Sequence, residues 1–292
     1  MRVLNKLVRK LTIAATAALS FTQPFSAQSQ DLNAFSQCVV FLHHDFIQTT
    51  TTPQGTFQVG LRKPGTQAFV PNILSKSGSA ILLTARNHGY LATAKHVATD
   101  MTFTGDDWLV TGSANGMSTN LLLASARGTN SSEWIHHDTA DVSILPLTPT
   151  PEALSILNGH FLDLPSSTLL GTNLPARSQA LTVIGFPLGI GWGRQPDELF
   201  APCTKHTRAA SGYLNGRTIF LVEDPSVQGY SGAPVFDLAE GIDTGSAHIS
   251  GGRPALFGLV SFTASDDTGG KMGGVVPIHF VLDLVEKHLA KQ

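Results

Sequence analysis

The chain has 292 residues, of which 42% are hydrophobic and only 14% are charged, and its formal net charge is −2. Globular proteins average about a quarter charged residues, so this composition lacks the material of long solvated helices, coiled coils and disordered regulators. It also lacks the basic face that neutralises phosphates, which excludes a nucleic-acid partner, and its 28 glycines and 16 prolines favour a β-rich globular protein.

Residues 1–29 have the pattern of a secretory signal peptide. Four basic residues precede an uncharged stretch at 11–21, and the small residues Ala27 and Ser29 then occupy the two positions that a signal peptidase reads. This stretch is shorter than the ~20 residues that cross a bilayer, and no later stretch is apolar over such a length. Removal of 1–29 leaves 15 basic and 21 acidic residues, a net charge of −6. We therefore expect a secreted or periplasmic protein without a membrane span.

Cys38 and Cys203 both remain after removal of the signal peptide. In an oxidising compartment two cysteines often form one disulfide, which here would tie the start of the mature chain to its second half. Two buried thiols are the alternative, because the sequence gives no distance between them.

Short segments rich in Val, Ile, Thr and Phe recur between Gly, Pro, Asn and Asp residues. Many short strands separated by turn residues predict an all-β barrel or sandwich. The expected strands are Gln37–Leu42, Thr56–Leu61, Ser79–Thr84, Gly89–Thr93, Leu109–Thr111, Asp141–Leu147, Gln179–Ile184, Thr218–Val222, Ala255–Phe262 and Gly274–Pro277. They share no fixed period, which excludes a propeller or a solenoid.

The C-terminus is the segment with a clear helical pattern. Its apolar residues fall on one face of a helix, and Pro277 suits the first turn. The residues of this face are Ile278, Val281, Leu282, Val285 and Leu289. Upstream, a stretch at 151–175 rich in Pro, Ser and Thr is interpreted as a connection between two β-rich halves, 30–150 and 176–292.

Three segments carry residues that suit nucleophilic catalysis. His96 follows a predicted apolar strand, Asp141 opens another, and Ser231 lies between glycines in the segment Gln228–Phe236. A serine on a tight turn can expose its hydroxyl beside backbone N–H groups that stabilise a tetrahedral intermediate. Taken singly, each residue also fits a structural role: a core histidine, an aspartate that caps a turn, or a glycine turn.

Together the three residues predict a hydrolytic site. Serine is a poor nucleophile at neutral pH and needs a base within hydrogen-bond reach, and the pKa of histidine suits that role. An aspartate on the other ring nitrogen fixes the tautomer and stabilises the imidazolium. Since His96 and Asp141 fall in the first half and Ser231 in the second, we expect the site between the two halves.

In these segments the chain resembles the trypsin-like (chymotrypsin-fold) serine proteases, over most of residues 36–290. Thr93-Ala-Lys-His96-Val resembles the Thr-Ala-Ala-His of the family and is closer to the Thr-Asn-Lys-His-Val of bacterial glutamyl endopeptidase-like members. Asp141-Val-Ser-Ile-Leu is similar to Asp-Ile-Ala-Leu-Leu, and Gly229-Tyr-Ser-Gly-Ala-Pro-Val to Gly-Asp-Ser-Gly-Gly-Pro-Val. The segments Ile184–Gly189 and Gly258–Thr263 and the C-terminal helix also resemble bacterial members.

The resemblance implies two six-stranded antiparallel β-barrels with a C-terminal α-helix. An N-terminal barrel at 30–150 would carry His96 as general base and Asp141 as its orienting group. A C-terminal barrel at 176–292 would carry Ser231 as nucleophile. The backbone N–H groups of Gly229 and Ser231 would form an oxyanion hole. The implied function is that of a secreted or periplasmic serine endopeptidase that uses no cofactor or metal.

The resemblance also implies a strand that pairs with the substrate backbone. The residues expected to bind substrate are Ser226, Ser261, Phe262 and Thr263. Members that cut after basic residues carry Asp where this chain has Pro225, and glutamyl endopeptidases carry His where it has Val260. Neither preference is therefore predicted. We expect a monomer that acts on a peptide or protein substrate.

Tyr230 departs from the family pattern. Animal members carry Asp immediately before the nucleophile, where it receives a new N-terminus after activation cleavage, and that switch cannot operate with Tyr230. A bulky side chain at this position could also distort the turn that aims the N–H of Gly229. A second hypothesis is therefore a catalytically impaired pseudoprotease that acts as a secreted peptide- or protein-binding module.

Two other site classes fit less well. An α/β-hydrolase esterase has the order Ser, acid, His and alternating helices, and neither occurs here. A metal site at His43-His44 or His136-His137 is disfavoured, because adjacent residues of a strand point to opposite faces. We expect these histidines in solvated turns.

Overall fold

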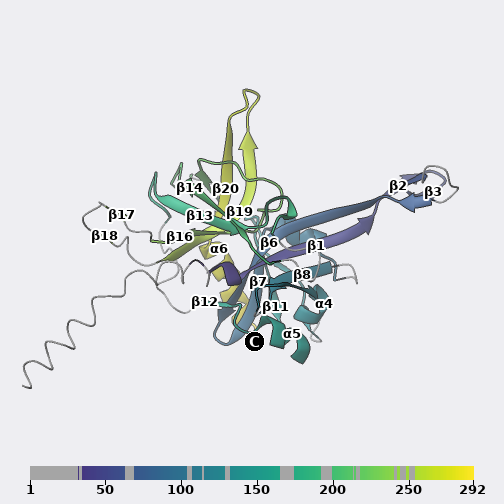
Figure 1. Cartoon of the computed structure of the whole chain (residues 1–292), viewed down its shortest axis with the longest axis horizontal. Coiled ribbons are helices and arrows are strands. Elements are labelled where there is room, and N and C mark those ends of the chain that lie inside the picture. The colour runs from purple at the N-terminus through teal and green to yellow at the C-terminus, as the bar shows by residue number, and fades with distance from the viewer. Residues whose placement is uncertain are drawn as a thin grey trace, which may run out of the picture. The chain divides into compact units, whose positions relative to one another are not determined.

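Two mainly antiparallel β-sheets carry most of the strands in the computed structural model of the chain (Figure 1). The structure describes residues 32, 35–62, 69–103, 107–113, 115–128, 132–164, 174–191, 199–212, 214, 218–239, 242–243, 248–249 and 254–292. The signal peptide expected at 1–29 lies outside this part of the chain. Residues 36–292 form one unit by themselves, and this unit holds both sheets. Within the described ranges, no helix is long and apolar enough to cross a membrane.

The first sheet has eight strands in the order β10-β11-β7-β6-β1-β8-β9, with β12 also paired to β6. Its strands are β1 (Val39–Ile47), β6 (Ile73–Ala85), β7 (His88–Thr93), β8 (Asp107–Gly112), β9 (Ser118–Leu122), β10 (Ile135–His136), β11 (Ser143–Leu147) and β12 (Leu162–Asp163). The sheet exceeds the six strands expected because the two-residue strands β10 and β12 extend it. Among the described strands of this sheet, only β12 pairs in parallel.

The second sheet has six strands, as expected, in the order β14-β13-β16-β19-β20-β15. Its strands are β13 (Ala180–Gly185), β14 (Cys203–Arg208), β15 (Phe220–Val222), β16 (Pro234–Asp237), β19 (Ala255–Ser265) and β20 (Lys271–Pro277). Three two-stranded sheets complete the described strands: β2 (Thr49–Thr52) with β3 (Gly55–Gln58), β4 (Gly60–Arg62) with β5 (Phe69–Pro71), and β17 (Ile242–Asp243) with β18 (His248–Ile249).

The apolar strand residues form a core in each sheet. In the first sheet Leu82, Leu91 and Leu145 are completely buried, and Val235 and Val275 are completely buried in the second. Burial of such side chains stabilises the fold by roughly 1.5–3 kcal/mol each. The sequence therefore encodes an all-β fold with a C-terminal helix, and this prediction is confirmed.

The C-terminal helix α6 (His279–Leu289) packs against β11 and β20. Its buried residues are Phe280, Val281, Leu284 and Val285. The apolar face is thus rotated from the predicted one, because Leu282 and Leu289 are only half-buried. Pro277 ends β20 and does not lie in the helix.

Shorter helices that were not predicted include α3 (Lys95–Asp100), α4 (Leu123–Arg127) and α5 (Pro151–Leu157). A short 3-10 turn, η1, also occurs at Pro187–Gly189. Helices of five to seven residues are too short to show a repeated apolar face. α5 begins inside the stretch interpreted as a connection, where the Thr150 hydroxyl accepts a hydrogen bond from the N–H of Ala153.

We predict that Leu82→Ala will lower the free energy of unfolding by about 2–5 kcal/mol, because it leaves a cavity in the first core. Urea unfolding followed by circular dichroism measures this change. Leu154→Ala makes the same chemical change at a half-exposed position of α5 and should stay within about 0.5 kcal/mol. Equal losses in the two variants would contradict the assignment of the core.

Candidate active site

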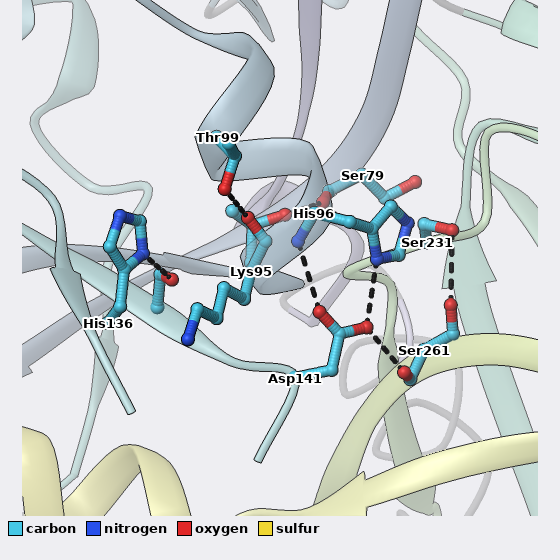
Figure 2. Close-up of polar contacts among 10 residues, drawn as sticks. Ser79, Lys95, His96, Thr99, His136, Asp141, Ser231 and Ser261 are labelled. Atoms are coloured by element: carbon cyan, nitrogen blue, oxygen red, sulfur yellow. Dashed lines mark hydrogen bonds and ion pairs between the residues drawn. The ribbon is translucent and has the colours of Figure 1, made fainter. Parts of the chain in front are cut away.

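His96 lies in a short helix after a buried strand. It is the second residue of α3, and β7 ends three residues earlier. Its ring Nδ1 is 2.8 Å from Asp141 Oδ2, and its backbone N–H donates to Asp141 Oδ1 at 3.0 Å (Figure 2). One carboxylate therefore holds both the ring and the backbone of His96, which fixes the direction of the imidazole.

Asp141 precedes β11 and accepts a further hydrogen bond from the second sheet. The hydroxyl of Ser261, on β19, donates to Asp141 Oδ2 at 2.5 Å. Ser261 was expected among the substrate-binding residues, but its side chain is turned to Asp141. Any contact of Ser261 with a substrate is therefore left to its backbone.

These hydrogen bonds set the protonation of the pair. The bond to Asp141 raises the pKa of His96 above its ordinary value; burial opposes this rise, and the charges of Asp141 and Asp100 add to it. Burial raises the pKa of Asp141, but the hydrogen bonds from His96 and Ser261 outweigh it, so the pKa is lowered overall. Near neutral pH the carboxylate is ionised, and the histidine is the group that titrates.

Ser231 lies on a turn before β16 that contains two glycines with positive φ. The φ angle is +95° at Gly229 and +83° at Gly232. The Ser231 hydroxyl donates to the carbonyl of Ser261 at 3.4 Å and not to His96. Figure 2 shows the second ring nitrogen of His96 on the side that faces Ser231. Both residues line one cavity of about 190 Å³, so the structure brings the three predicted residues together.

Ser79 joins the serine turn to the first sheet, and no motif in the sequence singled it out. Its side chain is completely buried at the middle of β6. Its N–H donates to the carbonyl of Ser231 at 2.8 Å, and its hydroxyl donates to the carbonyl of Gly229 at 2.7 Å. The same hydroxyl accepts from the N–H of Phe186 at 3.0 Å, and the Thr93 hydroxyl donates to the Ser79 carbonyl at 2.7 Å. The signal in the sequence is that a serine opens the predicted strand Ser79–Thr84, whose next four residues are apolar.

The backbone around Gly229 leaves two N–H groups available. The carbonyl of Gln228 accepts from the N–H of Leu188 at 2.6 Å, so the trans peptide aims the Gly229 N–H in the opposite direction. The carbonyl of Tyr230 accepts from Ala233 at 2.8 Å, which orients the N–H of Ser231 in the same way. Neither N–H has an acceptor among the described residues. A Cβ at Gly229 would lie 2.2 Å from the carbonyl oxygen of Phe186, so only glycine fits.

Tyr230 does not obstruct this turn. Its side chain is buried in the core of the second sheet, where burial and the nearby Cys203 raise its pKa to about 12. A Cβ at Gly185 would lie 2.9 Å from the Tyr230 ring, so the glycine makes room for it. The ring packs in the core, and Gly229 beside it has a left-handed φ of +95°.

The other residues expected to bind substrate lie on β19 and in the segment that precedes Ser231. Phe262 and Thr263 follow Ser261 on β19, and Phe262 is 39% exposed. The Thr263 hydroxyl donates to the carbonyl of Ser226 at 2.6 Å. The strand and the Ser226 loop are therefore bonded to each other.

The disulfide considered between Cys38 and Cys203 is not formed, because both side chains are thiols. Cys38 is buried just before β1 in the first sheet, and its carbonyl accepts from Leu82 at 2.8 Å. Cys203 opens β14 and pairs with Gly185 in the second sheet. Burial raises the pKa of Cys38 to about 12, which makes its thiol a poor nucleophile.

The histidine pairs also differ from expectation. His43 and His44 lie in β1 and His136 in β10, so they are strand residues and not solvated turn residues. His44 Nδ1 is 2.5 Å from Oδ1 of the completely buried Asp107. In the described part of the chain, no group of three or more His, Cys, Asp or Glu side chains is placed to hold a metal ion.

No family model and no curated protein matches the chain. Solved structures resemble it at low identity. The HtrA-type protease AlgW with a decapeptide is 14% identical, with 90% of this chain and 68% of that chain covered and a TM-score of 0.47. A serine-to-alanine form of AlgW with a decapeptide is 15% identical, with 90% of this chain and 67% of that chain covered and a TM-score of 0.49. An inactive serine-to-alanine mutant of Rv3671c from M. tuberculosis H37Rv is 13% identical, with 92% of this chain and 95% of that chain covered and a TM-score of 0.45. The function of this chain is therefore inferred from its own residues.

We predict that Ser79→Ala will lower the free energy of unfolding by about 1–3 kcal/mol. The change leaves the buried N–H of Phe186 and the buried carbonyl of Gly229 without the hydroxyl that joins them. Chemical denaturation measures the loss. Ser77→Ala, two residues earlier on the same strand and only half-buried, should change stability by less than about 0.5 kcal/mol. An unchanged free energy of unfolding in Ser79→Ala would show that the bonds to Ser79 do not hold the turn.

Proposed function

We propose that the protein is a serine endopeptidase that hydrolyses peptide bonds through His96, Asp141 and Ser231. The observation that carries the proposal is the Asp141 carboxylate, which holds His96 with a free ring nitrogen toward the cavity that Ser231 also lines. A histidine oriented in this way beside a serine on a glycine turn fits acyl transfer.

In the proposed reaction Ser231 Oγ attacks the carbonyl carbon of the scissile peptide bond while its proton passes to Nε2 of His96. Asp141 stabilises the imidazolium that forms. The N–H groups of Gly229 and Ser231 point away from neighbouring carbonyls and would donate to the oxyanion. When the C–N bond breaks, His96 returns the proton to the leaving amine. Water then hydrolyses the acyl-enzyme by the same proton transfers in reverse.

The finer features of the proposal come from the sequence. The pattern at 1–29 supports export, so we propose a secreted or periplasmic location. The motifs resemble bacterial members of the trypsin-like family, and we propose a monomer that acts on peptide or protein substrates. The lack of a histidine at Val260 gives no support for a glutamyl preference.

One observation favours a second candidate function, a pseudoprotease that binds peptides without cleaving them. The Ser231 hydroxyl bonds to the Ser261 carbonyl in place of His96. In serine proteases without substrate, the hydrogen bond between the serine and the histidine is often long or poorly aligned, and it shortens when substrate binds. The lack of a Ser231–His96 bond therefore does not exclude catalysis, and the endopeptidase is favoured.

Ser231→Ala is expected to abolish hydrolysis of a casein or peptide-library substrate, with a loss of at least ~10³-fold in kcat. Ser265→Ala changes an exposed serine at the end of β19 and should keep the activity of the unchanged protein. A fluorophosphonate probe should label Ser231 in the unchanged protein and not in Ser231→Ala. Folded protein that is neither active nor labelled would support the proposal of a binding module and overturn the proposal of an endopeptidase.

The activity should fall as the pH is lowered through the raised pKa of His96. The general base must be neutral, so kcat/KM should rise on the acid side with a midpoint above the ordinary histidine value of about 6.5.

Asp141→Asn should move the titration of His96 to lower pH, because the hydrogen bond and the charge that raise its pKa are lost. Proton NMR of the imidazole measures this shift without requiring activity. An unchanged midpoint in Asp141→Asn would contradict the assigned pair.

A further inference from the structure

Asp141 lies in the loop of a β-hairpin. The strands β10 and β11 form the hairpin, and the N–H of His137 donates to the carbonyl of Val142 at 3.0 Å to close it. Residues 138–141 are therefore a four-residue loop. Loops are on average more mobile than strands, whereas the Asp141 carboxylate has to stay within hydrogen-bond distance of His96. A contact that fixes this loop thus bears on the proposed reaction.

The ring of His137 makes such a contact. Its Nδ1 accepts from the N–H of Thr139 at 3.2 Å and from the N–H of Ala140 at 3.0 Å. These donors lie two and three residues after the ring, which is the pattern that Asn and Asp side chains make in tight turns. Because Nδ1 accepts both bonds, a neutral ring carries its proton on Nε2. A protonated ring would place an N–H against two N–H groups and would lose both bonds.

The same residue is connected to the helix that carries His96. The carbonyl of His137 accepts from Lys95 Nζ at 3.1 Å, and Lys95 is the residue before His96 in α3. His137 is not among the described residues that line the cavity of Ser231. An effect of His137 on the reaction would therefore act through the positions of Asp141 and His96.

The surroundings of the ring favour its neutral form. His137 is 8% exposed, and its ring packs edge-to-face on Phe280 of α6 with a centroid distance of 4.9 Å. Burial lowers the pKa of His137 below its ordinary value, positive groups on α6 lower it further, and two carboxylates oppose them. The positive groups are Lys287 and His279, and the carboxylates are Asp138 in the loop and Asp283 on α6. At neutral pH the ring is therefore uncharged and can accept both bonds.

We propose that His137 is a positioning residue of the candidate site, whose neutral ring holds the loop so that the Asp141 carboxylate faces His96. The inference rests on the proposed function and adds to it a residue that does not contact the substrate. It also adds a second proton-sensitive group, because acid would release the loop of Asp141 as well as protonate His96.

Two substitutions of His137 separate its acceptor from its packing. His137→Phe keeps an aromatic ring against Phe280 and removes the acceptor, whereas His137→Asn keeps an acceptor for the same N–H groups and removes the ring. With labelled casein, His137→Phe should lower kcat about 10–100-fold and change KM little, because a misplacement of about 1 Å can cost about 100-fold. His137→Asn should keep kcat within about 3-fold of the unchanged protein, since the loop stays in place.

The titration of His96, followed by proton NMR, is a readout that does not require activity. In His137→Phe it should move to lower pH, because the bond to Asp141 that raises the pKa of His96 is loosened. In His137→Asn it should stay in place. His136→Phe is the matched control, because this exposed histidine bonds to the Ser143 hydroxyl and not to the loop. It should change neither kcat nor the titration of His96.

The rate at which a fluorophosphonate labels Ser231 tests the role of the neutral ring. As the pH is lowered, the logarithm of this rate should fall with a slope steeper than one in the unchanged protein, since His96 and then His137 take up protons. In His137→Asn, whose side chain does not titrate, the slope should be one.

The outcomes separate the two proposals. If His137→Phe keeps kcat and the His96 titration, or if His137→Asn loses them, the ring of His137 only packs and the positioning proposal is overturned. Should His137→Phe not fold, a slope in His137→Asn that stays steeper than one overturns it, and a slope of one with normal kcat supports it. Absence of casein cleavage together with absence of labelling at Ser231 overturns the endopeptidase, and the His96 titration still tests His137.

Discussion

The candidate site depends on one buried serine. Ser79 uses its N–H, hydroxyl and carbonyl in four hydrogen bonds that join β6 to β7, to the end of β13 and to the turn of Ser231. A buried polar group is costly unless it is paired, and here every group of the residue is paired. The sheets also approach closely at this point, since a Cβ at Gly232 would lie 2.1 Å from the Ser79 carbonyl oxygen. The position of Ser231 relative to His96 follows from this contact.

Residue type and spacing were sufficient to predict many of the core strands and the C-terminal helix, although β9 and β14 were missed. They also singled out His96 and Ser231, which line one cavity, and Asp141, which bonds to His96. They were insufficient for Ser79, because its partners Phe186 and Gly229 lie 107 and 150 residues away along the chain. Sequence patterns report local periodicity and give no such distances. The effect of Tyr230 on the turn was open for the same reason: the space beside its ring is provided by Gly185, which is distant in sequence.

Some segments identified only by resemblance acquire a physical role in the structure. The stretch Ile184–Gly189 supplies the N–H groups of Phe186 and Leu188, which hold Ser79 and the carbonyl of Gln228. Ser261, expected to contact substrate, donates to Asp141 and accepts from Ser231, so it links the two ends of the site. Besides the His96 ring, Asp141 is thus held by two neutral donors, the Ser261 hydroxyl and the His96 backbone N–H, and such bonds are less affected by salt than ion pairs.

The separation of His96 and Asp141 from Ser231 has a consequence for when the site forms during folding. A chain in which only the first sheet has folded has an oriented histidine and no nucleophile. The contacts that complete the site span more than a hundred residues, and such contacts form late because loop closure must come first. Under the proposed function, hydrolytic competence would therefore arise only in chains that have finished folding, and partly folded copies, whose backbone is most open to cleavage, would not yet be able to cut one another.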